Sequence, residues 1–184
     1  DGSVGLLLDV GANTDCKPEV LSQFGQLGHI YAKNVLEIAN PRVALMNLGE
    51  EEKKGNLHAQ TAHQLLKANP HINFIGNIEG RDLFFNMADV VVCDGFIGNV
   101  ILKMAESIYD IASHRNIQDS FFDQLNYEAI GGSPILGING NVVIGHGISS
   151  AKAVKNMVVI AQKMVSSNLT NKLKQGLSTS SVNS

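Results

Sequence analysis

Tryptophan is absent from this 184-residue sequence, and aromatic residues together make up only 5% of it. Basic residues are not in excess either, because the formal net charge is −3 and the pI is near 6.1. Proteins that bind nucleic acid usually offer a basic surface and aromatic side chains on which bases stack. We therefore expect no nucleic-acid partner.

Cysteine and long apolar runs are also scarce. The two cysteines, Cys16 and Cys93, do not have C-x-x-C spacing, and no secretory leader precedes the first apolar run. Both features favour a reducing cytoplasm. No apolar stretch approaches the roughly 20 residues that a membrane-spanning helix needs. The G-x-G-x-x-G spacing occurs nowhere, so the sequence gives no support for NAD binding.

Apolar residues make up 44% of the sequence, which is enough for a filled core in a chain of this length. We expect one α/β domain over residues 1–165. A polar, partly disordered tail follows over residues 166–184, where Ser, Asn, Thr and Lys dominate. The first residues lead almost directly into an apolar run, so we interpret the chain as a piece cut from a longer protein.

Five short apolar runs each end in a loop of glycine, asparagine or acidic residues. The runs lie at residues 6–8, 43–46, 74–75, 90–92 and 142–144. Helical spacing of apolar residues predicts the helices that follow. These helices are expected at 18–38, 57–69, 82–86, 99–113 and 151–165, with a short amphipathic helix or turn at 114–126. The alternation predicts an α/β fold with a mainly parallel sheet flanked by helices.

Residues 90–92, Val-Val-Val, show no polar alternation, so we expect them to form a buried central strand. Gly95 and Gly98 follow in a tight connection before a helix predicted to begin at Asn99. The N–H groups that open a helix lack intrahelical partners and carry partial positive charge, so this connection is a candidate anion site. In an open α/β sheet all five loops would form one polar rim at the carboxyl edge, where ligands bind.

Polar side chains in these loops are candidate site residues, each with a structural alternative. Asn99 could orient a phosphate or thioester oxygen and Asp94 could position a base, or both could cap the helix and its turn. Lys103 could reach an anion or stay ion-paired at the surface. His146 could be an acid, a base or an oxyanion donor, or a structural histidine. Asn13 could bind a ligand or adopt a positive φ in its turn.

From these loops we predict two sets of site residues. The candidate catalytic residues are Asn99, Lys103 and His146. The candidate phosphate-binding or acyl-binding residues are Asn13, Asp94, Gly95, Gly98, Asn99, Gly145 and Gly147. We predict no metal site, because the glutamates at 50–52 lack interleaved ligands and favour a solvated loop or a subunit contact. Cys93 could be an acyl nucleophile, but its place after a valine strand favours a buried, inert thiol.

Five motifs follow one another along nearly the whole chain. They are LDVGAN at 8–13, NLGEEE at 47–52, FIGNIEGRD at 74–82, VVCDGFIGNV at 91–100 and GHG at 145–147. In this order they resemble the carboxyl-terminal half of the bacterial phosphate acyltransferase of phospholipid synthesis, the PlsX family. The resemblance implies a fold similar to the isocitrate and isopropylmalate dehydrogenases and a homodimer. It also implies transfer of a long acyl chain from acyl carrier protein to inorganic phosphate, with no cofactor.

The resemblance also indicates what the chain lacks. The amino-terminal half of the family, with its own strand and Asp/Gly-rich motif, is not present, so we expect little or no acyltransferase activity from this chain alone. A lysine-rich helical excursion of the family is shortened here to residues 113–126, which leaves weak association with the inner membrane surface open. A phosphate acetyltransferase-like enzyme is one alternative function. A non-catalytic module for dimerisation and carrier-protein docking is another.

Overall fold

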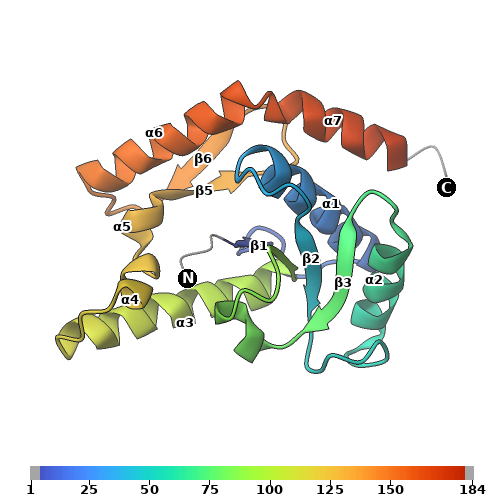
Figure 1. Cartoon of the computed structure of the whole chain (residues 1–184), viewed down its shortest axis with the longest axis horizontal. Coiled ribbons are helices and arrows are strands. Elements are labelled where there is room, and N and C mark those ends of the chain that lie inside the picture. The colour runs from blue at the N-terminus through green and yellow to red at the C-terminus, as the bar shows by residue number, and fades with distance from the viewer. Residues whose placement is uncertain (1–4, 181–184) are drawn as a thin grey trace. The chain divides into compact units, whose positions relative to one another are not determined.

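The computed structural model describes residues 5–180, which form two compact units (Figure 1). The sheet unit comprises residues 5–99 and 174–180, and the second unit comprises residues 100–173. Helices α3 (Gly95–His114) and α7 (Leu169–Ser180) each contribute residues to both units. The extent of one domain over residues 1–165 stays a prediction.

Four parallel strands form the centre of the sheet unit, in the order β1-β4-β2-β3. The strands are β1 (Leu6–Leu8), β2 (Arg42–Met46), β3 (Asn73–Ile78) and β4 (Val90–Val92). In the central strand β4, Val91 lies opposite Leu7 of β1 and Ala44 of β2. The predicted α/β fold with a mainly parallel sheet is therefore confirmed. The similarity to the isocitrate and isopropylmalate dehydrogenases stays a prediction.

Helices α1 (Pro18–Asn34) and α2 (Leu57–Ala68) pack against each other and against the strands (Figure 1). A Cβ atom at Gly28 would lie only 2.4 Å from Cγ1 of Val90, so glycine lets α1 approach β4 closely. The side chain of Asn56 caps α2 by accepting a hydrogen bond from the Ala59 N–H at 2.9 Å. This cap fixes where α2 begins after the long loop that follows β2.

The opposite face of the sheet has its own apolar cluster, in which Ala44, Val91 and Ile78 pack together. Val90 and Val92 point to the face that α1 covers, because successive side chains of a strand alternate. All three valines of β4 are buried. The unbroken valine run therefore corresponds to a strand covered on both faces, as predicted.

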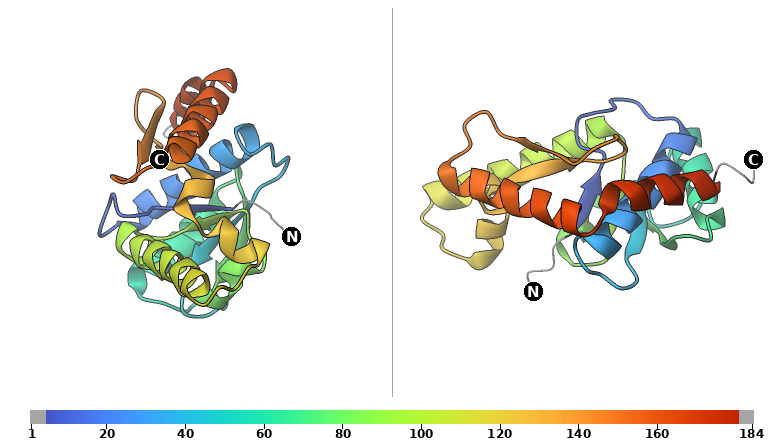
Figure 2. Two further views of the ribbon diagram at one scale, coloured as in Figure 1. Left: turned by 90° about the vertical axis from the view of Figure 1, so that its left-hand side faces the viewer. Right: turned by 90° about the horizontal axis from the view of Figure 1, so that it is seen from above.

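The fifth apolar run does not join the parallel sheet. In the second unit, β5 (Gly132–Ile135) and β6 (Val142–Gly145) form an antiparallel pair that packs beside α6 (Ala151–Ser166) (Figures 1 and 2). The prediction that residues 142–144 form another parallel strand is wrong. Residues 136–141 are too few for a crossover connection, which needs about a dozen residues or more, but they suffice for a hairpin.

Most predicted helices are present with shifted ends. Helices α2 and α6 agree with the prediction, α4 (Ser120–Gln124) forms within 114–126, and a further short helix, α5, spans Tyr127–Ile130. In place of the helix at 82–86 there is a 3-10 helix, η1 (Gly80–Phe84). Helix α1 ends four residues earlier than predicted, before Glu37, which has a φ of 60°. A left-handed residue of this kind is incompatible with a continuing α-helix.

Helix α7 is also not predicted, because it lies within the stretch expected to be a polar, partly disordered tail. Leu169 and Leu173 are buried, and their spacing is helical. The Gln26 amide of α1 donates to the Gly176 carbonyl at 2.7 Å. Residues 181–184 lie outside the described residues. Across residues 5–180, no helix is long and apolar enough to cross a membrane.

Candidate functional site

The loop that follows β1 turns around a buried carboxylate. Asp9 is only 5% exposed, and its oxygens accept hydrogen bonds from Ala12 N at 3.2 Å, Asn13 N at 2.6 Å and Asn13 Nδ2 at 2.9 Å. Gly11 permits the turn with a φ of 81°. Three donors satisfy the buried charge, which would otherwise be costly. Asp9 thereby orients the side chain of Asn13, which is itself exposed.

Backbone hydrogen bonds join this loop to the start of α3. Beyond the paired strands, Asp9 N donates to Cys93 O and Gly11 N donates to Gly95 O, both at 2.9 Å. In return, Gly95 N donates to Asn13 O at 2.8 Å. Residues 9–13 and 93–99 therefore form one continuous structure, which we call the interlocked loops.

Glycine is required at two positions of the interlocked loops. A Cβ atom at Gly98 would lie 1.8 Å from the carbonyl oxygen of Asp9, and one at Gly95 would lie 2.7 Å from that of Asn13. Both obstacles are backbone atoms, which cannot rotate away as the end of a side chain can. Two glycines predicted to bind a ligand are thus needed first for the close approach of the two segments.

Helix α3 begins at Gly95, so the tight connection predicted before Asn99 is instead the first turn of the helix. Asp94 caps this turn: its Oδ1 accepts from Ile97 N at 2.8 Å, and its backbone oxygen accepts from Gly98 N at 3.0 Å. The cap offsets the low helix propensity of glycine. Asp94 therefore caps the helix, and its carboxylate already lies at the positive end of the helix dipole.

Asn99 lies on the exposed side of this first turn, next to Gly11. Its Oδ1 is 3.5 Å from the place that a Cβ atom at Gly11 would take. Together with Asn13, it places two exposed amide side chains on the interlocked loops. The structure thus brings together five of the predicted site residues: Asn13, Asp94, Gly95, Gly98 and Asn99.

The other predicted site residues belong to the second unit. Lys103 forms an ion pair with Glu106 at 2.7 Å on the exposed surface of α3, which agrees with its structural alternative. His146 lies between Gly145 and Gly147 in the turn after β6, and its carbonyl oxygen accepts from the Ser149 hydroxyl at 2.6 Å. Whether these residues share a site with the interlocked loops stays a prediction from sequence.

The two cysteines are buried beneath the interlocked loops. Cys93 is 2% exposed, and its thiol donates to the Asp9 carbonyl at 3.4 Å. Burial, with a smaller effect from nearby Asp94, raises the pKa of Cys93 to about 12. Burial also raises the pKa of Cys16. A thiol with so little thiolate near neutral pH is a poor nucleophile, which confirms the interpretation of Cys93 as a buried thiol.

All three glutamates in the loop after β2 face basic side chains, with Glu51 at 3.8 Å from Lys54. Glu50 lies 3.9 Å from Arg81, and Glu52 pairs with Lys67 of α2. Within residues 5–180, no three His, Cys, Asp or Glu side chains gather as a metal site requires. The ion pairs are those of a solvated loop, and exposed pairs of this kind add little to stability.

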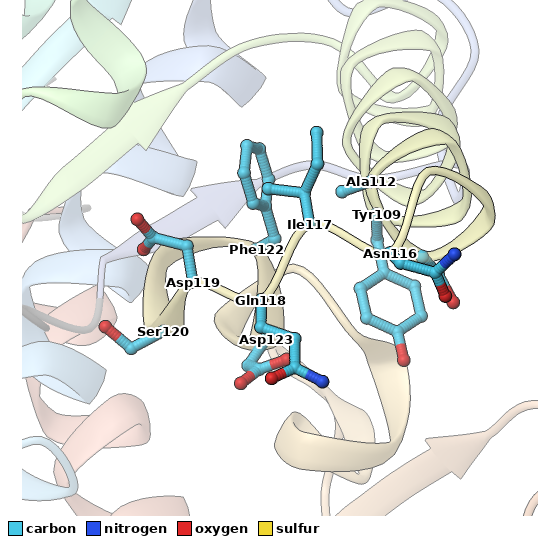
Figure 3. Close-up of a pocket in the computed structure, with 10 residues that line it drawn as sticks. Tyr109, Ala112, Asn116, Ile117, Gln118, Asp119, Ser120, Phe122 and Asp123 are labelled. Atoms are coloured by element: carbon cyan, nitrogen blue, oxygen red, sulfur yellow. The ribbon is translucent and has the colours of Figure 1, made fainter.

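A cavity of about 550 Å³ lies between the end of α3 and α4 (Figure 3). Its lining is mostly polar and includes Asn116, Asp119 and Asp123. At its edge the hydroxyl of Tyr109 accepts a hydrogen bond from Asn126 at 3.0 Å. None of the predicted site residues lines this cavity, so the candidate site is the interlocked loops.

The fold and the site define a class of protein. Ligands of open α/β sheets bind at the carboxyl ends of the strands, and the interlocked loops follow two neighbouring strands at that edge. The chain is therefore an α/β protein with a candidate polar ligand site at the ends of β1 and β4.

Comparison with known proteins identifies the family. Residues 1–115 match the family described as fatty acid synthesis protein, and the chain belongs to this family. Relatives named phosphate acyltransferase are 44% identical over 192 residues in Dictyoglomus turgidum, 46% over 183 in Heliobacterium modesticaldum and 44% over 197 in Campylobacter lari. These alignments cover 94%, 89% and 97% of the chain but only 57%, 54% and 59% of the relatives. The resemblance inferred from the five motifs is confirmed, and the chain spans little more than half the length of these relatives.

The contact between Gly98 and Asp9 gives a stability prediction. Gly98→Ala should lower the free energy of unfolding by about 3 kcal/mol, because the new methyl group displaces backbone on one side of the interlocked loops. Gly80→Ala is the control, since a Cβ atom there would meet nothing within 4 Å. Urea unfolding followed by circular dichroism measures both. Equal stability of Gly98→Ala and wild type would show that the two segments are not in close contact.

The burial of Cys93 gives a reactivity prediction. At pH 8 iodoacetamide should label Cys93 of the folded chain at least roughly 100-fold more slowly than in the urea-unfolded chain, because the buried thiol is neither accessible nor ionised. Mass spectrometry of the labelled peptides separates Cys93 from Cys16. Rapid labelling of Cys93 in the folded chain would contradict the assignment and reopen its role as a nucleophile.

Proposed function

We propose that this chain is part of an enzyme that moves a long-chain acyl group from acyl carrier protein to inorganic phosphate, giving acyl phosphate for phospholipid synthesis. Family membership supports a role in fatty acid synthesis, and the name of the relatives supports phosphate as the acyl acceptor. The observation that carries the proposal is the interlock of two motif segments, with Asn13 and Asn99 exposed at the same strand ends.

The proposed reaction needs no nucleophile from the protein. A phosphate oxygen attacks the thioester carbonyl, a C–O bond forms, and the resulting oxyanion collapses as the C–S bond breaks. The thiolate of the carrier protein leaves and takes up a proton. The protein has to hold phosphate against the carbonyl and stabilise the oxyanion. The high pKa of buried Cys93 is consistent with a route that has no acyl-enzyme intermediate.

Asn13 and Asn99 are the proposed donors to phosphate or to the oxyanion. The bond from Asn13 Nδ2 to Asp9 fixes the Asn13 amide before any ligand arrives, and donors fixed in advance stabilise a transition state best. The Asp94 carboxylate caps α3 and would repel a phosphate placed on the helix axis. We therefore place the anion against the two amide side chains.

The remaining features of the proposal rest on the sequence and on the family. The enzyme is a cytoplasmic homodimer that uses no cofactor, and Lys103 and His146 are its further catalytic candidates. Weak association with the inner membrane surface stays a prediction. The chain alone is expected to turn over little substrate, because it spans little more than half of its relatives. A site with one wall stays open to water, which competes for every hydrogen bond to phosphate.

Asn99→Ala in the complete enzyme tests this function. The substitution should lower kcat by roughly 10- to 100-fold, because the amide is proposed to act on charge that develops in the transition state. The melting temperature should change little, since the side chain is exposed. The measurement is acyl phosphate formation from palmitoyl carrier protein and phosphate, with acetyl carrier protein as a second donor.

Asn171→Ala is the matched control, because Asn171 is also an exposed helical asparagine. Its activity should equal that of the wild type. Unchanged turnover in Asn99→Ala, together with a large loss of melting temperature, would show that Asn99 only stabilises the first turn of α3. Faster turnover of the acetyl donor would instead favour the acetyltransferase alternative.

A further inference from the structure

A buried polar chain supports the loop that follows β2. His63 of α2 is 3% exposed and Asn77 of β3 is 6% exposed, although both lie where apolar side chains would pack. His63 Nδ1 and Asn77 Oδ1 are 2.8 Å apart, and Asn77 Nδ2 donates to the backbone oxygen of Glu51 at 2.9 Å. The chain of bonds thus runs from a helix through a strand to the loop.

The chemistry of the Glu51 carbonyl sets the direction of this chain. A carbonyl oxygen can only accept, so the Asn77 amide must turn its NH2 group toward Glu51 and its oxygen toward His63. The nitrogen that faces this oxygen must then carry a hydrogen. His63 is therefore protonated on Nδ1, which donates toward the loop backbone through Asn77, and its Nε2 lies 3.8 Å from the Glu52 carboxylate of the same loop.

Other side chains hold the same loop and the same ring. Gln60 of α2 donates to the backbone oxygens of Lys53 and Gly55, both at 3.0 Å. The Phe74 ring meets the His63 ring edge to face, with centroids 5.0 Å apart. The loop carbonyls at 51, 53 and 55 are thus held from beneath by α2 and β3.

The loop borders the candidate site. Strand β4 lies between β1 and β2, and Leu45 of β2 is opposite Val92 of β4. Residues 48–55, which follow β2, therefore leave the sheet on one side of β4, and residues 9–13, which follow β1, leave it on the other. Both loops lie at the carboxyl edge of one sheet. The β4 end that leads into α3 therefore has a supported loop on each side.

We propose that His63 and Asn77 are positioning residues that hold residues 48–55 in one conformation beside the phosphate site. Burying a polar side chain costs free energy unless its hydrogen bonds are all formed. Breaking one bond between His63, Asn77 and Glu51 should therefore release the whole loop and not only one local contact. The claim that the loop shapes phosphate binding rests on the proposed function.

Paired substitutions at His63 test the direction of the hydrogen bonds that run from His63 through Asn77 to Glu51. Asn places an amide N–H near the position of Nδ1, whereas Gln places it near Nε2, so His63→Asn should keep the bond to Asn77 and His63→Gln should lose it. Asn77→Asp removes the donor to Glu51 without changing the side-chain shape. Thr61→Ala, an exposed position on α2, is the control.

Hydrogen exchange followed by mass spectrometry reads out the loop, and titration calorimetry with inorganic phosphate reads out the site, both in the complete enzyme. His63→Gln and Asn77→Asp should speed exchange of peptides covering 48–55 by roughly tenfold and weaken phosphate binding severalfold. Peptides from β1 and β4 should be unchanged, and His63→Asn should stay near wild type in both readouts.

Two results would overturn the proposal. One is that hydrogen exchange of peptides covering 48–55 does not change in the variants, or rises by the same factor as in β1 and β4. His63 and Asn77 would then be ordinary parts of the core. The other is a loosened loop with unchanged phosphate affinity, which would separate the loop from the site. If wild type binds no phosphate, the proposed function fails, and exchange alone decides whether His63 and Asn77 position the loop.

Discussion

The approach of the Asp9 carbonyl to Gly98 is the constraint on which the rest of the site depends. It is possible only because residue 98 has no side chain, and it brings the first turn of α3 onto the loop after β1. The same approach puts Asn99 beside Gly11 and buries Cys93 beneath the loop. A single backbone contact thus determines which residues are exposed at the strand ends and which thiol is buried.

Buried polar groups support the carboxyl edge of the sheet on both sides of β4. On the side of β1, the Asp9 carboxylate collects three N–H donors and fixes the loop that carries Asn13. On the side of β2, His63 and Asn77 reach the backbone of the loop at 48–55. Each group costs free energy to bury unless its bonds are complete, so each loop is held in one conformation. Such rigidity suits a site that acts by placing donors in advance.

The apolar pattern of the sequence predicted the four parallel strands because a run such as residues 90–92 has no polar alternation and can only be buried on both faces. It could not place residues 142–144, because the short connection at 136–141 decides their partner. The pattern placed the start of α3 at Asn99 instead of Gly95, because glycine has a low helix propensity. The contact between Gly98 and Asp9, which holds this first turn, cannot be recognised in the sequence. His63 did leave a signal, because it lies three residues before Leu66 on the buried side of α2.

We propose that the interlocked loops bind phosphate through their exposed amides. A crystal structure of the complete enzyme soaked in inorganic phosphate tests it most directly. We expect an anion within hydrogen-bonding distance of the side chains of Asn13 and Asn99. An ordered phosphate bound elsewhere at the carboxyl edge, with both amides untouched, would contradict it.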